Sequence, residues 1–238
     1  MNFAINKVKS SAILAARISS ANPQIRESVR RNDKDALFKN LNTLMFESET
    51  DFMHVVNTGG EVLVRAEDKE RFGDSISEDP IIWRAFDGRA AVTIDTQYGI
   101  TVPTVSIRAS SPIVDTSPET GRQEIVGAVV TGFLLDTAFV DGIKKATGLD
   151  MGVFAGDTNV ATTFIVPETK ERLIGVRETD NKILDTVLKK RQTYTGTALI
   201  LNQPFLASYV PIQDIEETVI GMLFTGISQF DILAAITD

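Results

Sequence analysis

Three side chains of one predicted strand, Ser106, Arg108 and Ser110, have the residue types and the spacing of an anion-binding surface. Side chains alternate between the two faces of a strand, so these three share one face. A guanidinium can donate two parallel hydrogen bonds to one carboxylate, and a buried arginine needs such an anionic partner. Arg108 is therefore expected to bind the carboxylate of a small ligand or an internal aspartate, with Asp95 and Asp136 the nearest candidates. The remaining possibility is an edge strand with Arg108 in solvent.

A similar strand sequence recurs later in the chain, where ASYVPI follows the pattern of the earlier RASSPI. Pro112 corresponds to Pro211 at an offset of 99 residues, and Val62 corresponds to Val160 at an offset of 98. The order of predicted elements also repeats as a hairpin, a short helix and three further strands. This pattern predicts a tandem duplication; the alternative is a chance similarity between two strand-turn-strand units.

The duplication makes the polar face of the first copy informative. Its counterparts in the second copy are side chains that fill an interior: Phe205, Ala207 and Tyr209. If this face is enclosed in both copies, the second module is packed solid and the first encloses a polar space around Arg108. We expect that space to hold a small organic anion, with a carboxylate favoured.

Five further residues are candidates for the same ligand site. Trp83 lies on a short helix predicted to cross the sheet opening, where it forms either a wall or a core anchor. Tyr98 lies in the TQYGITVP loop, either as part of a lid or as an exposed loop residue. Arg65 ends the first hairpin and Thr131 lies in the middle of the fifth strand. Asp136 precedes the next helix and is also a candidate partner for Arg108.

Apolar residues at helical spacing predict a long, interrupted helical region over residues 1–50. Asn22-Pro23 is an N-cap followed by proline at a first helical position, and Asp33 is a further cap. Aspartates also predict the starts of three later helices, at Asp79, Asp136 and Asp180.

The fold class that these signals predict is α+β, with the long N-terminal helix followed by two modules. Each module is expected to contain a five-stranded antiparallel sheet with short flanking helices. The predicted boundaries are residues 1–50, 51–147 and 148–238, and a final helix is expected over 229–238.

The first helix carries a narrow stripe of small and apolar residues: Val8, Ala12, Ala15 and Ile18. Such a stripe suits helix–helix contact, either within the chain or across a two-fold axis. We expect it to form a weak homodimer.

Composition and missing motifs exclude several function classes. The net charge of −8 and the pI near 4.8 argue against nucleic-acid binding. Cysteine is absent and His54 is the single histidine, so no cysteine nucleophile, disulfide or histidine metal pair is possible. No nucleophile elbow and no phosphate loop occur. We expect no enzyme activity, no cofactor and no metal site, and we expect His54 to be a packed or edge residue of a strand.

The segment DFMHVVNTGGEVLVRA, the RASSPI and ASYVPI strands and the paired GAVVTG and GMLFTG strands resemble the double Cache family. This family comprises the tandem PAS-like extracytoplasmic sensor domains of chemoreceptors, sensor kinases and cyclases. The resemblance spans nearly the whole chain and is carried by packing and turn residues. It implies a membrane-distal PAS-like module at 51–147 and a membrane-proximal one at 148–238. It also implies a transmembrane helix on each side of the domain, so these residues look like an excised sensor region.

The resemblance implies that the chain senses a small molecule in its distal module as the extracytoplasmic part of a cell-membrane receptor. Many amino-acid-sensing members carry Arg, one residue, then Trp-Tyr, whereas this chain has Trp83-Arg84 without a following tyrosine. That departure favours a small organic acid. The alternatives are a soluble two-module domain that dimerises or docks a partner without a small ligand, and a hydrolase on the same scaffold.

Overall fold

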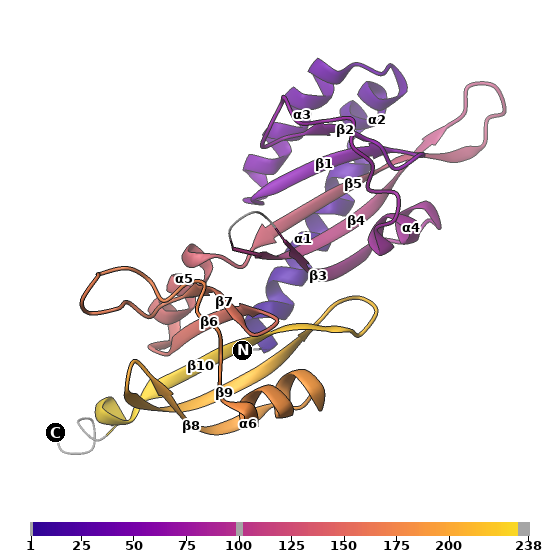
Figure 1. The fold of residues 1–238 in the computed structure, drawn as a ribbon. Helices are drawn as coiled ribbons and strands as arrows, with labels where there is room; N and C mark the ends of the chain where they lie inside the picture. The colour runs from indigo at the N-terminus through magenta and orange to yellow at the C-terminus, as the bar shows by residue number, and fades with distance from the viewer. Residues whose placement is uncertain (1, 99–101, 233–238) are drawn as a thin grey trace. The chain divides into compact units, whose positions relative to one another are not determined.

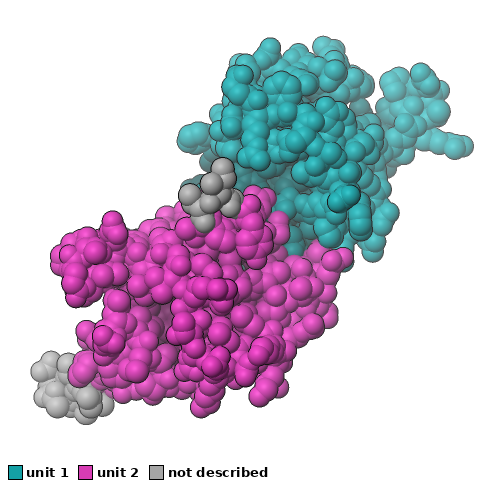
Figure 2. Space-filling model, in the orientation of Figure 1, with its two compact units in different colours: residues 1–93, 107–133 teal, residues 94–106, 134–238 magenta. Residues whose placement is uncertain are grey.

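The computed structural model describes residues 2–98 and 102–232, which include two five-stranded antiparallel sheets. The predicted α+β class, with an N-terminal helix and two tandem modules, is confirmed (Figure 1). The chain forms two compact units, residues 1–93 with 107–133, and residues 94–106 with 134–238 (Figure 2). Of the helix expected over 229–238, only residues 229–232 are described, and they are helical.

The N-terminal helical region is interrupted where the sequence predicts. The Asn22 side chain accepts hydrogen bonds from the backbone N–H groups of Gln24 and Ile25, and Pro23 begins the next helix. The Asp33 side chain caps the third helix through Ala36 N–H. The helices are α1 (Asn2–Ala21), α2 (Pro23–Arg30) and α3 (Lys34–Glu47). In the described part of the chain no helix is both long and apolar enough to cross a bilayer.

The first sheet has the strand order β2-β1-β5-β4-β3. One face packs on the N-terminal helices, with Ile25, Leu37 and Leu41 buried against Val55 and Val129. The elements of this module are β1 (Phe52–Asn57), β2 (Val62–Arg65), α4 (Pro80–Phe86), β3 (Ala91–Gln97), β4 (Thr104–Thr116) and β5 (Gln123–Leu134).

The second sheet repeats that order as β7-β6-β10-β9-β8, so each strand occupies the place of its counterpart five strands earlier. Its core is aromatic, with a chain of ring contacts that runs from Phe154 to Tyr209, Phe224 and Phe164. The elements are α5 (Thr137–Thr147), β6 (Asp150–Ala155), β7 (Thr158–Thr162), α6 (Asn181–Leu184), a π-helical turn (Asp185–Lys189), β8 (Tyr194–Ile200), β9 (Gln203–Gln213) and β10 (Val219–Ser228).

Candidate functional site

Arg108 is buried in the first module and is paired with an aspartate that the sequence analysis assigned only to a helix cap. The guanidinium Nη2 lies 2.5 Å from Oδ2 of Asp79, and both side chains are largely buried. The other oxygen of Asp79, Oδ1, accepts a hydrogen bond from Ile81 N–H at the start of α4. One carboxylate therefore caps α4 and also binds strand β4. Asp79 was not among the candidate partners named from the sequence.

Two further acid–base pairs lie in the first hairpin and the segment that follows it. Arg65 makes two hydrogen bonds to Asp74, at 2.7 and 2.8 Å, and these lower the pKa of the Asp74 carboxyl to about 2. His54 Nε2 lies 2.6 Å from Oε1 of Glu67, while burial lowers the pKa of His54 and favours the neutral ring. His54 pairs in register with Arg65, so the two residues share a sheet face.

The structure brings together only some of the predicted site residues. Ser110 lies on the Arg108 face and donates a hydrogen bond of 2.6 Å to the carbonyl oxygen of Ile81, so both residues hold the α4 segment. Ser106 is buried two residues before Arg108 on the same strand. Thr131 is also buried, but its hydroxyl donates to the carbonyl oxygen of Ala12 in α1. Thr131 therefore faces the N-terminal helices rather than α4.

The other predicted site residues lie at or near the surface. Trp83 is 55% exposed and donates from its indole nitrogen to the carbonyl oxygen of Ser77. It is not a core anchor. Tyr98 is 76% exposed, and residues 99–101 of its loop are outside the described part of the chain. Asp136 caps α5 by accepting a hydrogen bond from Phe139 N–H.

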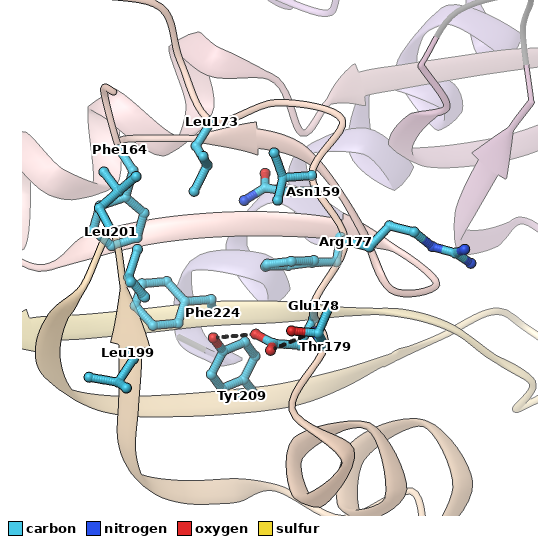
Figure 3. A pocket seen from close by; sticks show the side chains of 13 residues that line it. Asn159, Phe164, Leu173, Arg177, Glu178, Thr179, Leu199, Leu201, Tyr209 and Phe224 are labelled. Carbon is cyan, nitrogen blue, oxygen red and sulfur yellow. Dashed lines mark hydrogen bonds between the residues drawn. The ribbon is translucent and has the colours of Figure 1, made fainter. Parts of the chain in front are cut away.

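The second module is not packed solid, contrary to expectation. It contains a cavity of about 290 Å³ that is lined by Phe154 of the sheet and has Tyr209 and Phe224 as its floor. Figure 3 shows the rings of Tyr209 and Phe224. One wall comes from the irregular segment that includes Leu173 and Glu178, and another from residues 199–201 at the end of β8 and the start of the following turn. Phe205, Ala207 and Tyr209, which were predicted to fill this interior, are buried, and Tyr209 lines the cavity.

The two modules place a carboxylate at corresponding positions. Glu178 follows Asp79 at the repeat offset of 99 residues, and each binds a side chain of the fourth strand of its module. In the second module, the hydroxyl of Tyr209 donates to Oε2 of Glu178 at 2.9 Å, as drawn in Figure 3. Burial and the Glu178 charge raise the pKa of Tyr209, so its hydroxyl remains a donor.

Sequence reasoning missed Asp79 as the partner of Arg108, and it missed Glu178 and Asn159 in the second module. A signal for Asp79 was present, because the cap of a helix lying over a strand comes close to that strand. For Glu178 the signal was the repeat offset itself. Asn159 gives no signal, since an asparagine in a hairpin usually faces solvent. Among the described residues there is no group of three or more potential metal-ligating side chains.

The family comparison matches residues 131–238 to the family described as single Cache domain 3. No curated protein matches the chain. Solved structures with a similar fold include the periplasmic domain of Vibrio cholerae LuxQ, with a TM-score of 0.60, 11% identity and coverage of 97% of this chain and 94% of that one. The V. cholerae histidine kinase DctB sensor domain has a TM-score of 0.53, 11% identity and coverage of 96% and 95%.

A third similar structure is titled methyl-accepting chemotaxis protein X, with a TM-score of 0.54, 14% identity and coverage of 94% of this chain and 92% of that one. At these identities the likeness shows a common fold. The predicted resemblance to the tandem Cache sensor domains is thus confirmed for the fold, and residues 131–238 are similar to a Cache family model.

Proposed function

We propose that this chain is the extracytoplasmic ligand-sensing region of a membrane receptor and that it binds a small organic anion in its first module. The observation that carries the proposal is Arg108, a buried guanidinium held by the same carboxylate that caps α4. The similarity of residues 131–238 to a Cache family model and the fold shared with a histidine kinase sensor domain and a methyl-accepting chemotaxis protein support the receptor role.

In this proposal the Asp79 carboxylate occupies the position of a ligand carboxylate. We expect a ligand carboxylate that makes a bidentate pair with Arg108 to compete with Asp79 for the guanidinium and to displace it. Asp79 and Ser110 hold the α4 segment at two points, so displacement shifts α4. Ligand occupancy is thereby converted into a movement of backbone elements, and no chemical step is needed.

The test is a calorimetric screen of acetate, lactate and succinate against wild type and two variants. Arg108→Lys keeps the charge that pairs with Asp79 but loses the planar guanidinium, which can donate two parallel hydrogen bonds to one carboxylate. Binding of the acids should therefore weaken tenfold or more. Asp79→Ser keeps a capping oxygen but removes the competing carboxylate, so binding should tighten. If the Arg108–Asp79 pair is purely structural, none of the three acids should bind to wild type or to either variant. That outcome, or equal binding by Arg108→Lys and wild type, would overturn the proposal.

We further propose that two copies of the chain associate through α1. The predicted stripe does not form one surface, because Ala12 and Ala15 are buried within the chain. Leu14 and Ile18 are each 57% exposed, and they border a hollow of about 370 Å³ that Leu44 also lines. Exposed apolar side chains beside a hollow suit a self-complementary contact across a two-fold axis.

Replacing Leu14 and Ile18 together by glutamine should remove this association without lowering the melting temperature, since both side chains are already half in solvent. Sedimentation velocity over a range of protein concentrations measures the dimer fraction. Ile165→Gln is the matched control, because Ile165 is 49% exposed in the second module. A wild-type protein that remains monomeric at millimolar concentration contradicts the proposal.

A further inference from the structure

A buried polar side chain lines the cavity of the second module. Asn159 is 4% exposed, and among residues 2–98 and 102–232 its carboxamide Oδ1 has no hydrogen-bond partner. Figure 3 shows this carboxamide among the lining side chains, on the side opposite Leu199 and Tyr209. A buried acceptor without a donor is destabilising, and each such atom in a folded protein requires an explanation. A donor supplied by a ligand explains it.

The backbone fixes Asn159 in this position. Its N–H donates to the carbonyl oxygen of Val176 and its carbonyl oxygen accepts from Gly175 N–H, at 2.9 and 2.7 Å. These two bonds join β7 to the segment that forms one wall of the cavity. The side chain of Asn159 is therefore part of a built site and not a mobile surface group.

The charge in the cavity wall is negative. Glu178 accepts hydrogen bonds from the Tyr209 hydroxyl and from the backbone N–H groups of Thr179 and Asp180, and these three donors are uncharged. Its negative charge is not neutralised by them. Arg177, which also lines the cavity, is paired with Asp157 at 2.9 Å. The rings of Phe154, Tyr209 and Phe224 add aromatic faces, which attract cations.

We propose that this cavity is a second ligand site and that it binds a small primary amine with an apolar body. The ammonium group donates hydrogen bonds to Oδ1 of Asn159 and is balanced by Glu178, and the apolar body packs on the aromatic floor. A water molecule occupies about 30 Å³ in the liquid, so the cavity volume corresponds to roughly ten heavy atoms. The site differs from the proposed Arg108 site in module, charge and ligand class.

Phenethylamine is the probe, with 2-phenylethanol and phenylacetate as matched neutral and anionic compounds of similar shape. Titration calorimetry on the whole chain should show binding of the amine, and at least tenfold weaker binding of the alcohol and the carboxylate. Asn159→Leu should reduce amine binding tenfold or more. Its ligand-free melting temperature should equal or exceed that of wild type, since the variant removes an unsatisfied buried acceptor.

Glu178→Gln retains an acceptor for the Tyr209 hydroxyl and removes the negative charge. It should therefore weaken binding of the amine and leave binding of the alcohol unchanged. Arg108→Lys should not alter amine binding, which separates this site from the proposed anion site. Absence of amine binding overturns the inference even if carboxylates bind to the first module. Equal binding of amine and alcohol, or unchanged amine binding by Asn159→Leu, also overturns it.

Discussion

Gly221→Ala should destabilise the second module by about 3 kcal/mol, at the upper end of the cost of overpacking. A Cβ atom at Gly221 would lie 1.9 Å from the carbonyl oxygen of Phe154, on the neighbouring strand β6. The obstacle is backbone, so no side-chain rotation relieves it. Relief requires strands β6 and β10 to move apart where they are paired. Chemical denaturation followed by circular dichroism measures the loss.

Gly142→Ala is the matched control for this substitution. Gly142 is exposed within α5, and nothing lies within 4 Å of the position of its Cβ. Alanine is the better helix former, so this variant should gain about 0.5–1 kcal/mol. The same substitution, glycine to alanine, should then lower stability at position 221 and raise it at position 142. If Gly221→Ala is tolerated like Gly142→Ala, strands β6 and β10 are not paired as described.

Asp79→Ser should lower the stability of the first module by about 3 kcal/mol or more, because breaking one side of a buried ion pair costs about 3–5 kcal/mol. Serine keeps an oxygen that can cap α4, so the loss reports the missing charge opposite Arg108. The corresponding fall in melting temperature is about 10 °C for a domain of this size. Differential scanning calorimetry measures it.

Two control variants separate the contribution of the ion pair to stability from the contribution of the helix cap. Asp33→Ala removes only a capping carboxylate, at α3, and should cost about 1 kcal/mol. The double variant Arg108→Met/Asp79→Ser should be more stable than Asp79→Ser alone, since it removes both members of this pair. An Asp79→Ser loss no larger than that of Asp33→Ala would show that the pair contributes little to stability.

The fold could be predicted because its signals are local. The capping residues Asn22, Asp33, Asp79 and Asp136 all accept backbone N–H groups where the sequence predicts helix starts. The repeat then predicted two sheets of the same kind, since two copies of one pattern have to satisfy the same packing. The π-helical turn after α6 was not predicted, because no sequence periodicity distinguishes it from an α-helical turn.

The candidate sites could be predicted only in part. Burial of Arg108 followed from the duplication, but its partner depends on how the segment before α4 crosses the sheet, and that segment has no periodic pattern. The cavity was missed for a similar reason. Tyr209 was identifiable as an interior residue, whereas the space between it and Leu173 is set by an irregular segment and by the end of β8. Sequence patterns predict which side chains face inward, not the volume that they leave.

Trp83 has a spectroscopic consequence. It is the single tryptophan of the chain, and it lies on α4, next to the residues that Asp79 caps. Indole can be excited separately from the three tyrosines, so its fluorescence reports on α4 without a label. The half-exposed ring becomes fully hydrated when this segment leaves the sheet, and its emission then moves to longer wavelength. Ellipticity sums over both modules, whereas this emission is sensitive to the first alone.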